Sequence, residues 1–112
     1  MDEAPLLSNI FPELAAEIEA LLKARGEGDL ASQVLGLRIV ERCRCGDDFC
    51  ATIYSIPKPK GAWGPGYRAF DIDAPTGMII LGALNEKIAD IEILNRDEIR
   101  KKLNDAFPLV KR

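Results

Sequence analysis

The feature that most restricts the fold of this chain is a change of hydrophobic period at Leu37. Before it, apolar residues recur at three- and four-residue spacing, whereas after it they alternate with polar residues. The first pattern is typical of amphipathic helices and the second of half-buried strands, because side chains repeat every 3.6 residues or so in a helix and every second residue in a strand. The chain is therefore predicted to begin with helices and to continue as β structure.

Two helices are expected before the change of period. Residues 11–25 have an amphipathic pattern, and Pro12 suits the first helical position, where its missing N–H costs nothing. A shorter helix is predicted over residues 28–36, with Asp29 as its N-terminal cap. Residues 1–8 precede both helices and are expected to be flexible.

Five strands and a final helix are expected in the remainder. The strands are predicted at residues 37–45, 49–55, 67–73, 77–84 and 87–94, and the helix at residues 96–107 with Asp97 as its cap. Strands joined by short turns pair antiparallel, because parallel pairs need a long crossover. The predicted fold is a single α+β domain over residues 1–112. It is a five-stranded antiparallel β-meander with two N-terminal helices and one C-terminal helix packed on one face.

Charge and hydropathy exclude several classes of partner. The net charge of −3 disfavours nucleic acid, and no apolar run approaches the ~20 residues that a membrane span needs. The N-terminus lacks the basic and apolar regions of a secretory signal, so we expect a cytoplasmic protein with reduced thiols. Residues 37–70 carry six bases and three acids, a basic segment that could complement an acidic protein partner. A monomer or simple homodimer is expected.

All three cysteines lie in the octapeptide CRCGDDFC, at Cys43, Cys45 and Cys50. Metal binding, with zinc as the candidate cofactor, is one interpretation. Structural zinc sites favour paired cysteines two to four residues apart and four ligands, and this chain has no histidine to complete the set. A fourth ligand would have to be Asp47, Asp48 or a residue from a partner.

The disulfide interpretation depends on the register of the predicted hairpin over residues 37–55. A four-residue loop over residues 46–49 would place Cys45 opposite Cys50, within reach of a bond, whereas a three-residue loop would place Arg44 there. A reactive or redox-sensing thiolate is a third possibility, because nearby arginines lower a thiol pKa. The fourth is that the thiols pack as small apolar side chains, as free cysteines often do.

The second candidate site is the Pro- and Gly-rich loop over residues 57–66, which contains the only tryptophan. Aromatic and arginine side chains on a restrained loop are typical of protein-binding surfaces, which makes these the candidate binding residues: Trp63, Tyr67, Arg68, Arg42 and Arg44. The alternatives are that Trp63 folds back over the sheet, and that the arginines at positions 38, 42 and 44 form a solvated face.

Two carboxylates, Asp71 and Asp73, alternate at the end of the third predicted strand. Such a pair can hold a hard cation, but no third acid is near in sequence, and Asp also favours turns. The turn is the preferred interpretation. The lack of histidine also excludes Ser-His and Cys-His catalysis within this chain, and no catalytic residue is predicted.

The run IVERCRCGDDFCATIY, followed by the loop GAWGPGYR, resembles a family of small uncharacterised bacterial proteins that share a CRCGDxFC hairpin. The stretch GMIILGALNEKIADIEILNRDEI is similar to other small bacterial domains of unknown function. Neither resemblance implies an activity or catalytic residues. We therefore expect a non-enzymatic protein-binding domain that uses the segment over residues 38–68. The alternative is thiol-based metal binding or redox sensing.

Overall fold

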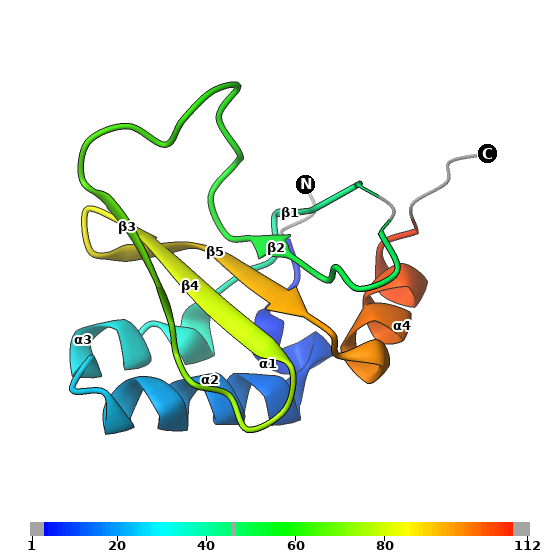
Figure 1. The fold of residues 1–112 in the computed structure, drawn as a ribbon, viewed down its shortest axis with the longest axis horizontal. Coiled ribbons are helices and arrows are strands. Elements are labelled where there is room, and N and C mark those ends of the chain that lie inside the picture. Colours follow the sequence, from blue (N-terminus) through cyan, green and yellow to red (C-terminus); the bar gives the residue numbers. More distant parts are fainter. Residues whose placement is uncertain (1–3, 46, 109–112) are drawn as a thin grey trace.

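The computed structural model describes residues 4–45 and 47–108 (Figure 1). Its helical elements are α1 (Leu7–Ile10), α2 (Pro12–Ala24), α3 (Gly28–Ala31), the 3-10 turn η1 (Val34–Gly36) and α4 (Asp97–Ala106). Its strands are β1 (Glu41–Arg42), β2 (Ile53–Tyr54), β3 (Tyr67–Asp71), β4 (Met78–Leu84) and β5 (Lys87–Leu94). The predicted α+β class with an antiparallel five-stranded sheet is confirmed.

The N-terminal helices follow the predicted pattern with one interruption. Helix α2 begins at Pro12 and buries an apolar stripe that includes Ile18 and Leu22. The predicted second helix is divided into α3 and η1. Between them the hydroxyl of Ser32 donates a hydrogen bond to the carbonyl of Asp29 at 2.8 Å, an alternative partner that weakens a continuing helix. Asp29 itself lies in the first turn of α3 and does not cap it.

Residues 4–8, within the segment expected to be flexible, form hydrogen bonds with the chain around Leu37. The amide of Leu7 donates to the carbonyl of Leu37, and the amide of Ile39 donates to the carbonyl of Pro5, both at 2.8 Å. Leu7 is fully buried at the start of α1, a helix that the periodicity did not predict. Residues 1–3 lie outside the described chain.

The sheet is antiparallel throughout, in the order β1-β2-β5-β4-β3. This order differs from the consecutive order of the expected meander, because the loop after β2 crosses to the far edge before β3 begins (Figure 1). The strand order follows from the apolar content of the individual strands. The hairpin of β4 and β5 contributes fully buried side chains such as Leu81 and Ile93, and a central position buries them best. The short β1 and the more polar β3 take the edges.

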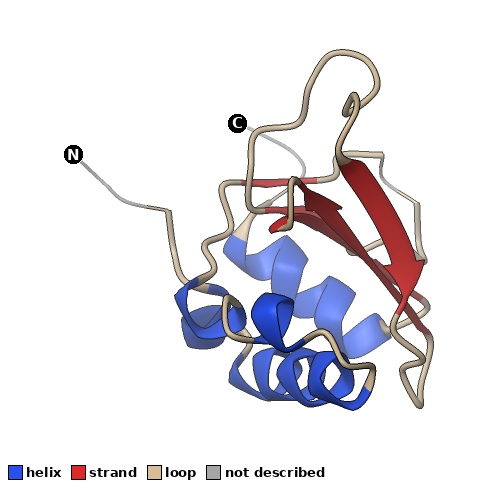
Figure 2. Ribbon diagram, turned by 90° about the vertical axis from the view of Figure 1, so that its left-hand side faces the viewer, coloured by secondary structure: helices blue, strands red, loops and turns tan. Residues whose placement is uncertain are grey.

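The molecule has two layers, with the helices against one face of the sheet and no helix on the other face (Figure 2). Inward-facing residues of the central strands meet α1, α2 and α3 in one continuous core. The opposite face, called here the open face, carries the alternate side chains of every strand. No helix in the described chain is long and apolar enough to cross a bilayer.

Candidate metal centre

The register of the β1–β2 hairpin determines where the thiols lie. Glu41 pairs with Tyr54 and Arg42 with Ile53, and the amide of Cys43 donates to the carbonyl of Thr52 at 2.9 Å. The same register carried to positions 45 and 50 corresponds to the four-residue loop over residues 46–49. Gly46 is outside the described residues. Of the two registers considered from the sequence, the structure has the one that places Cys45 across from Cys50.

The three thiols gather on the open face of the sheet. Cys43 and Cys45 are two residues apart and therefore point to the same side, and Cys50 reaches that side from the opposing segment. All three Sγ atoms lie within 4.8 Å of one another. Cys45 is exposed, whereas Cys43 and Cys50 are half-buried, and all three are free thiols. We call these residues the thiol cluster.

The thiols of Cys50 and Cys45 have pKa values shifted in opposite directions. Burial opposes ionisation of Cys50, but its hydrogen-bonding contacts with the hydroxyl and amide of Thr52 and with the neighbouring thiols outweigh burial and lower its pKa. In the neutral form, Sγ of Cys50 donates to the hydroxyl of Thr52 at 3.4 Å. The amide of Asp47 favours the Cys45 thiolate, but desolvation and the two other thiols prevail and raise the pKa of Cys45 to about 11. In the absence of a cation, the three sulfurs therefore do not ionise together.

The spacing of the cluster is close to what a metal ion requires. Two sulfurs bound to the same zinc lie at most about 4.6 Å apart, the sum of two Zn–S bonds, so small side-chain rotations suffice to bring these sulfurs onto one ion. No carboxylate oxygen of residues 4–45 and 47–108 belongs to the cluster. Three close thiols could therefore bind a metal ion as three of its ligands.

The three other interpretations of the cysteines were packing in an apolar core, a disulfide and a reactive thiolate. Packing in an apolar core is wrong for Cys45, which is exposed. A disulfide between Cys45 and Cys50 fits the register, but it would use two sulfurs of a group in which the third, that of Cys43, lies within 4.8 Å of both. A reactive thiolate, if present, is placed at Cys50 by the lowered pKa.

The inward side of the hairpin is fastened to α4 by arginines. Arg42 is only 4% exposed. Its guanidinium donates to Oδ1 of Asn104 at 2.7 Å and to the carbonyl of Phe107 at 3.0 Å. Arg44 donates to the carbonyl of Pro108 at 3.2 Å. The expectation of a solvated arginine face is therefore wrong for Arg42, because the negative end of α4 attracts it inward.

Phe49 lies at the start of the strand predicted over residues 49–55 but does not share the burial of Ala51 and Ile53. Its side chain is 49% exposed, whereas Ala51 and Ile53 are buried. The reason is that Phe49 belongs to the turn, where its carbonyl accepts a hydrogen bond from Asn95 at 2.9 Å, so the alternation of the strand does not extend to it.

Trp63 folds back onto the open face. Its ring stacks on that of Tyr67, with ring centres 5.3 Å apart and planes 6° from parallel. The Tyr67 hydroxyl donates to Oδ1 of Asp90 at 2.9 Å, and both atoms occupy the space that a Cβ at Gly82 would fill. Burial raises the pKa of Asp90, with the Tyr67 hydrogen bond opposing this in part. The alternative in which Trp63 covers the sheet is the one observed.

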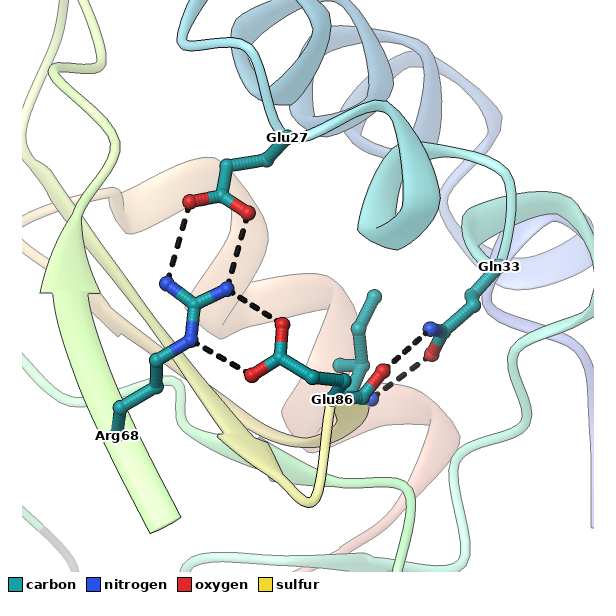
Figure 3. Close-up of polar contacts among 5 residues, drawn as sticks. Glu27, Gln33, Arg68 and Glu86 are labelled. Atoms are coloured by element: carbon teal, nitrogen blue, oxygen red, sulfur yellow. Dashed lines mark hydrogen bonds and ion pairs between the residues drawn. The ribbon is translucent and has the colours of Figure 1, made fainter. Parts of the chain in front are cut away.

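Arg68 is fully engaged within the chain (Figure 3). It donates two hydrogen bonds to Glu27 and two to Glu86, all between 2.8 and 3.1 Å. The side-chain amide of Gln33 donates to the carbonyl of Glu86 and accepts from the backbone amide of Ile88. These contacts hold the tight β4–β5 turn, where Glu86 has a positive φ of 64°. Arg68 therefore joins three parts of the fold.

The Asp71 and Asp73 pair forms a turn. The carboxylate of Asp71 accepts a hydrogen bond from the amide of Asp73 at 2.8 Å, the pattern of an Asx turn. Asp73 has a φ of 60° and forms an ion pair with Arg25 at 3.0 Å. The preferred interpretation from the sequence is confirmed.

A pocket of about 330 Å³ adjoins the thiol cluster. Its lining consists of Cys43 and Cys45 with Glu41, Arg42, Arg44, Tyr54 and Lys58. The ammonium of Lys58 lies 5.9 Å from the centre of the Tyr54 ring, and its amide donates to Glu41 at 3.3 Å. A larger pocket of about 530 Å³, lined mainly by apolar residues such as Val40 and Ile56, has no thiol or carboxylate in its lining.

Sequence reasoning did not identify two residues that position the cluster. Thr52 faces the same side as Cys50 because it is two residues further along the strand. Its proximity to the thiol cluster can be inferred only once the register of the hairpin is known. Asn104 holds Arg42 from 62 positions away and carries no local signal at all.

Comparison with known proteins does not add to this picture, because no family model, curated protein or solved structure matches the chain.

Proposed function

We propose that this protein binds a thiophilic metal ion, of which zinc is the leading example, through Cys43, Cys45 and Cys50. The observation that supports this is the convergence of three Sγ atoms within 4.8 Å of one another on one face of a hairpin. Thiolate ligands favour zinc and monovalent copper over hard cations such as magnesium. A third sulfur adds nothing to a disulfide, but it is a further ligand for a metal.

The surroundings of the sulfurs support the same role. The hydroxyl and amide of Thr52 contact the sulfur of Cys50 and lower its pKa, and the amide of Asp47 favours the Cys45 thiolate. Such hydrogen bonds stabilise thiolates and orient them toward an ion. A bound cation also supplies the positive charge that allows all three sulfurs to ionise together, with release of their protons.

The experiment measures zinc in purified protein by elemental analysis and its affinity by competition with a chromophoric chelator. We expect one zinc per chain, and an affinity at least about 100-fold lower in Cys43→Ser or Cys50→Ser. Thr52→Val should weaken binding by about 10- to 100-fold, since it removes only the supporting hydroxyl. Thr76→Val, an exposed threonine elsewhere, is the matched control and should bind as the parent does.

Two results would overturn the proposal. One is the lack of any stoichiometric binding of zinc, copper(I) or cobalt(II) to fully reduced protein. The other is equal affinity in the parent and in the serine variants, which would place the bound metal elsewhere on the chain.

A further inference from the structure

A metal ion held by the thiol cluster has one position left open. Zinc in proteins takes four ligands, and sites with three protein ligands hold a water or a substrate at the fourth position. Within residues 4–45 and 47–108, no carboxylate reaches the cluster to fill that place. Outside these described residues, water or a separate molecule is available to supply the remaining ligand.

The space for such a molecule is the 330 Å³ pocket, which shares Cys43 and Cys45 with the cluster. Its size is at the lower end of the range of small-molecule sites. A ligand seated in it lies beside Cys43 and Cys45 and is therefore next to a metal ion held by the thiol cluster.

The charge of the pocket selects the ligand. Arg44 and Lys58 are exposed cations in its lining, opposed by the single carboxylate of Glu41. The Lys58 ammonium contacts the Tyr54 ring and forms no ion pair with a carboxylate of the described chain. An anionic group in the pocket could therefore form an ion pair with the ammonium of Lys58. The ring of Tyr54 provides an apolar surface against which a short carbon chain can pack.

We propose that this pocket binds a small thiol that carries a carboxylate, an inference that rests on the proposed metal function. The sulfur coordinates the metal as a thiolate, displaces one water and releases its proton to solvent, with no change of oxidation state. The carboxylate pairs with the ammonium of Lys58. The ligand class is therefore a mercaptocarboxylate of a few carbon atoms.

The test uses the full chain loaded with cobalt(II) under anaerobic conditions, after all reductant has been removed. Mercaptoacetate is the probe, and neutral 2-mercaptoethanol is the comparison. A fourth thiolate should raise the sulfur-to-cobalt charge-transfer absorption by about a third, because three thiolates become four. Mercaptoacetate should bind about fivefold more tightly than 2-mercaptoethanol, the gain of an exposed ion pair.

Lys58→Gln should remove the preference for mercaptoacetate, and Lys101→Gln, an exposed lysine on α4, should keep it. The inference is overturned if cobalt binds but mercaptoacetate leaves the spectrum unchanged or strips the metal. It is also overturned if Lys58→Gln retains the preference. Failure of the proposed function looks different, because the charge-transfer band is then missing before any small thiol is added, and the inference falls with it.

Discussion

The guanidinium of Arg42 donates a hydrogen bond of 2.7 Å to Oδ1 of Asn104 and so joins the thiol-bearing hairpin to α4. We expect Arg42→Leu to lower the free energy of unfolding by about 2–3 kcal/mol, because it leaves two partly buried acceptors without their charged donor. Urea denaturation measures this directly. Arg44→Leu is the matched control, and it should cost less than about 0.5 kcal/mol because Arg44 is exposed. Equal costs for the two variants would contradict the role of Arg42.

Gly82 leaves room for the hydrogen bond between Tyr67 and Asp90. A Cβ there would collide with both side chains, so Gly82→Ala should destabilise the protein by about 1–3 kcal/mol and move Trp63 away from Tyr67. Tryptophan fluorescence and thermal unfolding report the two effects. Gly61→Ala meets no atom within 4 Å and should change neither. A fluorescence spectrum that Gly82→Ala leaves unaltered would argue against this account.

Asp90 should make stability depend on pH. Burial raises its pKa above the ordinary 3.8, so the folded protein binds the proton more tightly than the unfolded chain. Stability attributable to this group is therefore present below pH 3.8 and is lost as the pH rises through the folded pKa. Asp90→Asn keeps an acceptor for Tyr67, and its stability relative to the parent should increase from pH 4 toward pH 7. A difference that stays constant across this range would refute the assignment.

Cys50 should react with an alkylating reagent before Cys45, although Cys45 is the more exposed of the two thiols. Cys45 is exposed, but with a pKa of about 11 only about 0.1% of it is thiolate at pH 8, whereas Cys50 is half-buried with a lowered pKa. Alkylation of metal-free protein with iodoacetamide should therefore modify Cys50 first. Fragmentation of the tryptic peptide that follows Arg44 distinguishes the two sites. Faster modification of Cys45 would contradict the hydrogen bonding described for the cluster.

Zinc should stabilise the folded protein through the same three residues. At a free zinc concentration 100 times the dissociation constant, the free energy of unfolding should rise by about 2.7 kcal/mol. Chemical denaturation with and without zinc measures this gain. Cys50→Ser should show almost none of it. An equal zinc effect on Cys50→Ser and parent protein would indicate a metal site away from the cluster.

Elements with a strong local pattern were predictable from the sequence. β5 occupies residues 87–94 as predicted, since its isoleucines alternate with acids, and α2 begins at Pro12 as predicted. The division of α3 from η1 was not, because it depends on whether the Ser32 hydroxyl prefers a backbone carbonyl to water. The strand order depends on which hairpin buries more apolar surface, a comparison that no single segment contains.

The candidate site was predictable in its members but not in its geometry. The cysteines are visible in the sequence, but their convergence depends on a one-residue difference in register. The partner-binding hypothesis treated Arg42 and Arg68 as available, and their acceptors, Asn104 and Glu27, are distant in sequence. A protein partner at the surface around Arg44 and Trp63 stays a prediction.

The position of β5 has a consequence for the order in which the protein is made. β5 leaves the ribosome after the other four strands of the sheet, yet it is the inner neighbour of β2. The two-residue strands β1 and β2 form a hairpin too short to persist alone. During translation, the three cysteines therefore remain on an unstructured nascent chain until residue 94 has emerged. The thiol cluster is therefore assembled only after residue 94 has emerged, and before that point the three thiols lie on separate, mobile stretches of nascent chain.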